Sequence, residues 1–163
     1  MARPIAVEDF SSRLPGKARL IGLDLGTKTI GLAISDVERR IASPLRTLPR
    51  RAFQKDADAL IAIFTEFEVA GVILGLPLDL AGREGPRTQS TRAFARNLAA
   101  RTDLPIAFWD ERFSTAAVTR SLIANDVSRG RRAQVVDKMA AAYILQGALD
   151  RLAAAAERPA RDL

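Results

Sequence analysis

Apolar and polar residues follow two different periods along this chain, and the first clear pattern has a period of two. Residues 20–24, "LIGLD", form a short apolar run that ends at an acid. Residues 29–35, "TIGLAIS", place bulky apolar residues at every second position. Alternation of this kind is typical of β-strands. The pattern predicts two strands that form a hairpin around the turn at 26–28.

Further along the chain the apolar residues recur at helical spacing, in segments that alternate with short apolar runs. Pro44 and Pro49 would interrupt a central strand, so the run between them is predicted as an edge strand. The predicted elements after the hairpin are an edge strand at 44–48, a helix at 54–69, a buried strand at 70–77, a helix at 88–104, a strand at 105–111, a helix at 114–126 that Ser114 opens, a basic loop at 127–134 and a last helix at 135–157. This order predicts an α/β fold with a mixed sheet, antiparallel and then parallel, flanked by α-helices.

One compact domain suits a chain of 163 residues with 48% apolar content. Residues 1–18 mix Pro, Ser, Gly and charge without a period, and we expect them to form a flexible N-terminal extension. The predicted domain covers residues 19–156, and a short tail at 157–163 follows it. No apolar run is long enough to span a bilayer, so a cytoplasmic protein without a membrane partner is expected.

The composition narrows the chemistry. The chain has no histidine and no cysteine, which excludes imidazole catalysis, thiol nucleophiles and zinc sites built on these ligands. Its 25 Lys and Arg against 19 Asp and Glu give a net charge of +6. A basic balance favours a polyanionic partner, and nucleic acid is the expected one.

Acidic residues stand at the ends of two predicted strands and near the start of the last helix. Asp24 closes the first strand, Asp110 and Glu111 close the last, and Asp137 lies in the predicted first turn of the final helix. A carboxylate at the end of a central strand is costly to bury unless a cation or hydrogen bonds compensate it. Oxygen ligands without histidine suit Mg²⁺ or Mn²⁺. Two such ions would activate water and stabilise the leaving oxygen of a phosphodiester.

Each acid also has a simpler explanation. Asp137 would suit the positive end of a helix dipole. The slim turn of alanines at 140–142 would nevertheless let the helix approach the sheet and bring Asp137 near Asp24. Glu111 could form a structural ion pair with Arg112. Since Asp110 and Glu111 would point to opposite faces of a continuing strand, only one should reach the site, and Glu111 is preferred.

Several basic residues are candidates for binding a nucleic-acid backbone. Lys28 in the hairpin turn would contact a phosphate or extend into solvent, and Gly26 beside it supplies a positive φ or room for close backbone approach. The candidate substrate-binding residues are Lys28, Arg112, Arg129, Arg131 and Arg132, and Arg83, Arg87, Arg92 and Arg96 would extend the same rim. Trp109, in the middle of a predicted strand, is expected to pack in the core rather than to stack on a base.

Four segments resemble the YqgF/RuvX family in order and spacing. They are "IGLDLGTKTIGLAISD", "GVILGLPLDLAGREG", "DERFST" and "VVDKMAAAYILQ", within residues 20–149. Members of this family are named as Holliday-junction resolvases and pre-16S rRNA nucleases. The resemblance implies a ribonuclease H-like fold, a cytoplasmic nuclease in 5′-end maturation of 16S rRNA precursor, and Asp24, Glu111 and Asp137 as catalytic and metal-binding residues. The chain departs from the family at 80–82, where Leu-Ala-Gly replaces the common Met-Asp-Gly.

Three other functions remain open from the sequence. A Holliday-junction resolvase would act on DNA as a dimer with paired sites, whereas an RNA-processing enzyme could be a monomer. A ribosome-assembly factor would bind RNA without cutting it. "DLGT" also resembles the phosphate loop of actin, heat-shock ATPases and sugar kinases, but the chain has no second copy and would be half of such a protein at most.

Overall fold

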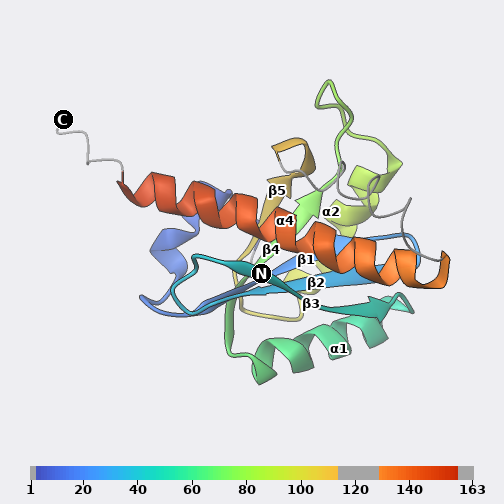
Figure 1. Ribbon diagram of the computed structural model, residues 1–163, viewed down its shortest axis with the longest axis horizontal. Helices are drawn as coiled ribbons and strands as arrows, with labels where there is room; N and C mark the ends of the chain where they lie inside the picture. The colour runs from blue at the N-terminus through green and yellow to red at the C-terminus, as the bar shows by residue number, and fades with distance from the viewer. Residues whose placement is uncertain (1–2, 114–128, 158–163) are drawn as a thin grey trace.

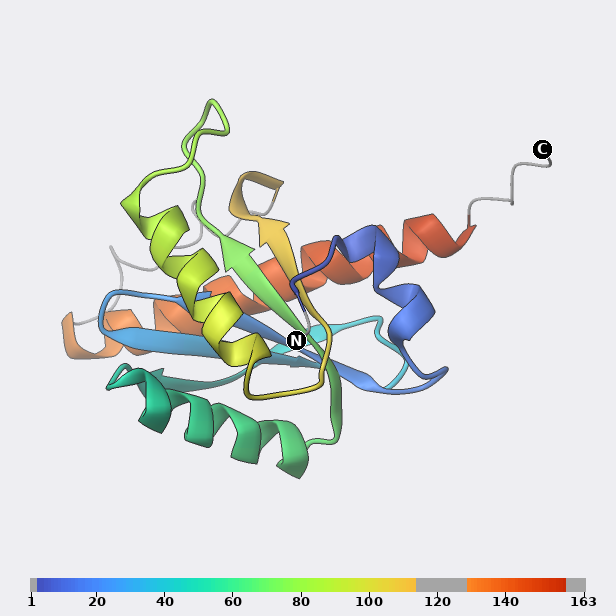
Figure 2. The same cartoon turned by 180° about the vertical axis from the view of Figure 1, so that it is seen from behind.

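The computed structural model describes residues 3–113 and 129–157, with the backbone alone for residues 129–136. A five-stranded sheet forms the centre of the molecule, and helices lie on both of its faces (Figures 1 and 2). The described elements are η1 (Val7–Asp9), η2 (Ser11–Arg13), β1 (Arg19–Leu25), β2 (Thr29–Ser35), β3 (Ala42–Pro49), α1 (Phe53–Glu66), β4 (Val69–Leu76), α2 (Pro86–Ala99), β5 (Ile106–Asp110), η3 (Glu111–Phe113) and α4 (Arg129–Glu157).

The sheet has the strand order β3-β2-β1-β4-β5. Strand β2 pairs antiparallel with both β1 and β3, while β4 pairs parallel with both β1 and β5. The predicted hairpin, the edge strand β3 and the mixed sheet are therefore confirmed. Since β1, β4 and β5 are parallel, their carboxyl ends meet at one edge of the sheet, where α/β proteins commonly place their sites.

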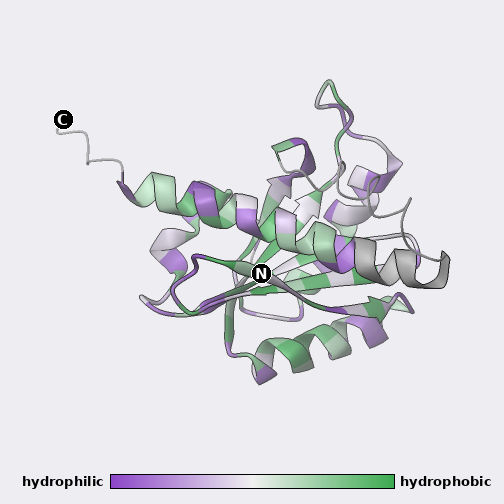
Figure 3. Ribbon diagram, in the orientation of Figure 1, coloured by the Kyte–Doolittle hydropathy of each residue, from purple (hydrophilic) through white to green (hydrophobic). Residues whose placement is uncertain are grey.

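Two different layers cover the sheet. Helices α1 and α2 pack on one face through large aliphatic and aromatic side chains, including Leu60 and Phe64 of α1 and Leu98 of α2. The single long helix α4 packs on the other face, where its alanines Ala140 and Ala141 are fully buried. Figure 3 shows that hydrophobic residues dominate the strands, whereas hydrophilic ones mark the loops and the outer sides of the helices. The alanine turn thus brings the helix close to the sheet, as its sequence predicts.

Helix α4 begins earlier than its sequence pattern predicts. The helix starts at Arg129, so the segment that was predicted as a basic loop is helical from that residue on. Arg, Ala and Gln are good helix formers, and one glycine within the turn is tolerated. Asp137 consequently lies more than two turns inside the helix, and its predicted place in the first turn is wrong. A helix-dipole role for Asp137 loses its basis, because that effect fades within the first turn.

The N-terminal segment is packed against the sheet, although its irregular composition predicts a flexible extension. Phe10 is fully buried and lies where a side chain on Gly71 would be. The Ile5 amide donates to the Ile106 carbonyl at 2.8 Å, and Ile5 forms a parallel bridge with Ala107. These contacts are between residues distant in sequence, so no local pattern announces them. The domain boundaries at 18/19 and 156/157 remain predictions.

Two further expectations have different outcomes. Trp109 packs between Phe113, at 6.2 Å between ring centroids, and Gly147 of α4, which confirms its packing role. The predicted helix at 114–126, with Ser114 as its cap, lies outside the described residues. No helix in the described ranges is both long and apolar enough to cross a membrane.

Candidate active site

Asp24 lies near the carboxyl end of β1 and is fully buried. Its direction follows from the strand period, because residues two apart share a face. A side chain at Gly22 would come within 2.7 Å of Leu145 Cβ and 3.0 Å of the Ala141 carbonyl oxygen, both in α4. Asp24 therefore points to the face that α4 covers.

Asp137 reaches the same place from α4. In the β1–β2 ladder Asp24 is paired with Gly31, and a side chain at Gly31 would overlap the backbone carbonyl of Asp137. The helix can lie this close to β2 only because Gly31 has no side chain. The Thr29 hydroxyl donates a hydrogen bond to Oδ2 of Asp137, and that oxygen is 3.1 Å from where a Cβ on Gly26 would stand. The hairpin thus holds the Asp137 carboxylate directly beside the end of β1.

Glu111 comes from the third side. Strand β5 ends at Asp110, and Glu111 begins the turn η3. Its Oε1 lies 2.9 Å from where a Cβ on Gly75 would stand, on the side of Ile144 in α4. Leu23 and Leu74 form the last pair between β1 and β4, and Asp24 and Gly75 are the residues that follow them. Glu111 therefore extends over β4 toward Asp24.

The structure also separates Asp110 from Glu111. By the alternation of β5, Asp110 points to the face of α1 and α2, and it forms an ion pair with Arg112 at 2.7 Å. Burial raises the pKa of Asp110, but hydrogen bonds from the Arg112 side chain and amide outweigh it and hold this pKa below its ordinary value. The same contact raises the pKa of Arg112. Within the described residues Arg112 pairs with Asp110, and an ion pair with Glu111 is not found.

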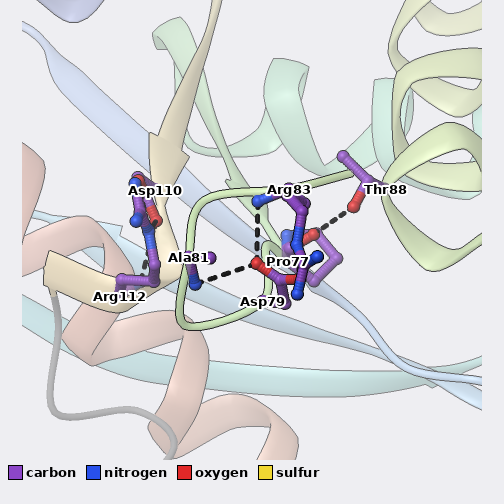
Figure 4. A network of polar contacts seen from close by, with 7 residues as sticks. All are labelled: Pro77, Asp79, Ala81, Arg83, Thr88, Asp110 and Arg112. Carbon is purple, nitrogen blue, oxygen red and sulfur yellow. Dashed lines mark hydrogen bonds and ion pairs between the residues drawn. The ribbon is translucent and has the colours of Figure 1, made fainter. Parts of the chain in front are cut away.

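The Arg112 guanidinium also meets the glycine-containing loop after β4 (Figure 4). Its Nη1 lies 2.9 Å from the position of a Cβ on Gly82, which has a φ of +82°. The loop is folded around Asp79, whose carboxylate accepts the Ala81 and Arg83 amides at 2.9 and 2.8 Å. The hydrogen bond from the Arg83 amide is the main reason that the pKa of Asp79 is lowered. Asp79 escaped the sequence analysis, although an Asp that is followed by a glycine three residues later is a turn signal.

The hairpin turn presents Lys28 at the surface, where its side chain is exposed. Gly26 is absent from the residues with positive φ, so its role is to leave room for the Thr29 carbonyl and the Asp137 carboxylate. Arg50 donates to the Gly26 carbonyl at 2.8 Å, and Arg87 donates to the Leu25 carbonyl at 3.3 Å. These two cations hold the turn from the α2 side, and no local pattern distinguishes Arg50 from other surface arginines.

Three of the predicted substrate-binding residues cannot be placed. The backbone of Arg129, Arg131 and Arg132 forms the first turn of α4, and their side chains lie outside the described residues. Of the other two, Lys28 stands beside the turn that borders Asp24, and Arg112 is engaged by Asp110.

The donor set fits a hard divalent cation. Asp24, Glu111 and Asp137 share one face and one edge of the sheet and offer only oxygen atoms, with the Thr29 hydroxyl beside them. No group of three or more acidic residues in the described ranges is placed closely enough to hold a metal ion by itself. Mg²⁺ does not require a complete shell of protein ligands, because it usually keeps several waters and takes one or two carboxylates together with substrate phosphate. The arrangement can thus hold a cation that a phosphate would complete.

Comparisons with known proteins identify the family of the chain. Residues 18–151 match the family model described as "RuvX: Holliday junction resolvase". A protein of Methylocella silvestris is 61% identical over 151 residues, covering 93% of this chain and 94% of the relative. A protein of a Bradyrhizobium species is 63% identical over 145 residues, covering 89% of this chain and 90% of the relative. Both carry the name "Putative pre-16S rRNA nuclease".

Among solved structures, the chain is similar to a resolvase bound to its substrate, "T. thermophilus RuvC in complex with Holliday junction substrate". The TM-score is 0.52 at 13% identity, with 83% of this chain and 96% of the other covered. A further Thermus thermophilus RuvC structure gives a TM-score of 0.53 at the same identity and coverage. Similarity at this level concerns the fold alone, and it confirms the predicted fold class.

Proposed function

Because the chain belongs to the RuvX family, we propose that it is a metal-dependent nuclease that hydrolyses phosphodiester bonds in pre-16S rRNA during 5′-end maturation. The observation that carries the proposal is the convergence of Asp24, Glu111 and Asp137 at the carboxyl ends of the parallel strands. The names of its relatives at about 60% identity support the choice of substrate. Its positive charge is compatible with a polyanion.

In this proposal Asp24, Glu111 and Asp137 hold Mg²⁺ or Mn²⁺. The ion would supply a bound hydroxide and charge stabilisation at the leaving oxygen. Asp24 is fully buried, so its carboxylate is shielded from bulk water. Thr29 fixes the Asp137 carboxylate through its hydroxyl, and Gly75 leaves the space that the Glu111 carboxylate enters. These contacts orient the carboxylates toward one place, where a cation would lie between them and the scissile phosphate.

The basic residues around the site position the substrate. Lys28 at the exposed hairpin turn is placed to contact a backbone phosphate next to the carboxylates. Arg112 ties the glycine-containing loop to the end of β5, and its charge, partly neutralised by Asp110, would be shared with a phosphate. Arg129, Arg131 and Arg132 at the start of α4 are the proposed extension of this contact surface.

The proposal is tested with purified protein on end-labelled pre-16S-like RNA and on a four-way DNA junction, each with Mg²⁺, Mn²⁺ or EDTA. Metal-dependent RNA cleavage that the Asp137→Asn variant loses is the expected result. Cleavage that is unchanged in this variant would come from a contaminating nuclease.

A second candidate function is Holliday-junction resolution, which the description of the family model favours. A resolvase must make two coordinated nicks, so it should be a symmetric dimer with paired sites. Cleavage of the junction alone, by a protein that sediments as a dimer, would replace rRNA processing with this function. Binding of either substrate without cleavage in any metal would contradict both and indicate a ribosome-assembly factor.

A further inference from the structure

A cavity of about 660 Å³ lies on the face of the sheet opposite the carboxylates. Its walls come from three parts of the chain that are distant in sequence: the N-terminal segment, helix α2 and strands β4 and β5. The principal lining residues are Arg3, Ile5, Leu76, Arg92, Arg96 and Phe108. The volume falls in the range of sites that bind small molecules.

The N-terminal wall of the cavity is held by backbone contacts. The hydrogen bond from the Ile5 amide to the Ile106 carbonyl adds this segment to the free edge of β5, beside which it runs in Figure 2. Val7 and Phe10, which follow directly, are buried against the sheet. Arg3 is thereby brought opposite α2, and the cavity is preformed.

The cavity gathers like charges. Arg92 and Arg96 lie one turn apart on the same side of α2, and Arg3 faces them from the N-terminal segment. Such convergence is unfavourable unless an anion offsets it. Arg92 is paired with Glu84, but neither Arg3 nor Arg96 forms an ion pair or side-chain hydrogen bond in the described part of the chain. Two guanidinium groups are therefore available to an anionic ligand.

The same cavity offers a flat stacking surface. The Arg92 guanidinium carbon lies 5.2 Å from the centre of the half-buried Phe108 ring, so a cation and an aromatic ring are stacked at the wall. Aromatic rings and arginine planes are the surfaces on which proteins stack unpaired bases. Arginines that bind an anion, beside a surface on which a base stacks, match the phosphate and the base of a nucleotide.

The cavity and the carboxylates share the ends of the same strands. Leu76 is the last residue of β4, and Phe108 lies two residues before the end of β5. Gly75 next to Leu76 borders Glu111 on the opposite face. A nucleic-acid strand that passes the carboxyl edge of β4 and β5 can therefore reach both places.

We propose that this cavity binds one unpaired nucleotide of the substrate strand, with its phosphate at Arg3 and Arg96 and its base against Arg92 and Phe108. This inference rests on the proposed function for the identity of the strand. The cavity then anchors a single-stranded extension and sets the distance from it to the bond that is cut. Fully paired substrate would gain nothing from it.

The test measures affinity in EDTA, at fixed salt, for an RNA hairpin with a single-stranded uridine extension and for the same hairpin with a blunt end. Wild type should bind the extended RNA more tightly, and Arg96→Glu should lose about tenfold of that preference. Arg13→Glu is the matched control, because Arg13 is exposed and its side chain forms no hydrogen bond or ion pair within the described ranges, while the substitution changes the net charge equally. The Ile5→Pro variant, which removes the amide that holds the wall, should lose the preference too.

The proposal would be overturned if Arg96→Glu and Arg13→Glu lowered the affinity for both RNAs equally, because this would indicate general charge attraction. Calorimetry with uridine 5′-monophosphate and with inorganic phosphate shows whether the cavity binds a free nucleotide or phosphate alone instead of a nucleotide within a strand. Binding of the free nucleotide through Arg96, without any gain from the extension, would overturn the assignment to a strand. The binding test requires no cleavage. If Asp24→Asn still cut RNA, that result would contradict the proposed function alone. A binding preference that depends on Arg96 would still support the cavity.

Discussion

The two faces of the central sheet are packed by opposite means. Under α1 and α2 the contacts are made by large side chains, such as Leu60, Phe64 and Leu98. Under α4, beside large side chains such as Ile73, Ile144 and Leu145, the sheet also presents glycines and the helix alanines, so backbone approaches backbone there. Large side chains bury more apolar area per residue and contribute more to stability. Small residues bury less but let helix and sheet approach, and that approach brings Asp137 over the residue paired with Asp24.

The comparison teaches that the face with the closer approach of helix and sheet is the one on which the carboxylates converge. A buried carboxylate costs free energy that only hydrogen bonds or a cation can offset. On the α1 and α2 face the buried acid, Asp56, is satisfied by the Arg51 amide at 3.0 and 3.2 Å. On the α4 face several carboxylates converge, which is the arrangement that a divalent ion would stabilise. We therefore assign stability chiefly to one face and chemistry to the other.

The largest effect is expected from neutralising an acid on the α4 face. Glu111→Gln should lower the rate of RNA cleavage about 100-fold to 1,000-fold, because a preorganised charged ligand is lost. Asp110→Asn, at the adjacent residue but on the other face, should lower the rate less than about tenfold, since it breaks only a partly exposed ion pair. Initial rates at saturating Mg²⁺ measure both. Equal losses in the two variants would break the distinction between the faces.

A smaller effect is expected from adding one methyl group at the close contact of helix and sheet. Gly31→Ala places a Cβ on the Asp137 backbone, so it should cost about 1 to 3 kcal/mol of stability and displace the carboxylate. Leu98→Ala on the other face should cost about 2 to 5 kcal/mol yet leave the cleavage rate per folded molecule unchanged. Urea unfolding and cleavage rates, measured together, compare the two variants. Normal cleavage by Gly31→Ala would show that close packing is not needed for the chemistry.

The hydrogen bond from the hairpin to Asp137 can be removed without changing shape. Thr29→Val deletes the hydroxyl that donates to the carboxylate, and cleavage should fall about tenfold as one charge-assisted hydrogen bond is lost. Thr29→Ser keeps the hydroxyl and should retain most of the activity. The pair is compared by cleavage rate at several Mg²⁺ concentrations. A deficit that Thr29→Ser fails to restore would argue against the hydrogen bond as the cause.

The smallest effect concerns pH and the Asp110–Arg112 ion pair. The pKa of Asp110 in the folded chain lies below its ordinary value of 3.8, so the ion pair stabilises the fold fully above that value. This stabilisation is lost as the pH falls through the lowered pKa. The difference in melting temperature between wild type and Asp110→Asn should therefore be constant from pH 7 to pH 5 and shrink toward zero in strong acid. A difference that grows on acidification would contradict the direction of this pKa shift.

The site could be predicted from sequence wherever local pattern determines it. The alternation in residues 29–35 predicted the hairpin that pairs Asp24 with Gly31, and the alanine turn indicated a helix close to the sheet. What escaped prediction depends on contacts between distant segments. Nothing near Phe10 shows that Gly71 leaves room for its ring. The basic residues from 129 onward are helical because Arg, Ala and Gln are good helix formers, although their charge suggested a loop. Arg112 pairs with Asp110 because the strand ends there and the chain turns.

The most direct test compares the two buried aspartates, one on each face. Asp24→Asn should lower RNA cleavage at least about 100-fold while the free energy of unfolding changes by less than about 1 kcal/mol. Asp56→Asn should cleave RNA at the wild-type rate and lose about 1 kcal/mol of stability, because the hydrogen bond from the Arg51 amide is then made to a neutral oxygen. Both quantities are measured on the same preparations. Normal cleavage by Asp24→Asn, or equal loss in the two variants, would contradict the assignment of chemistry to the α4 face.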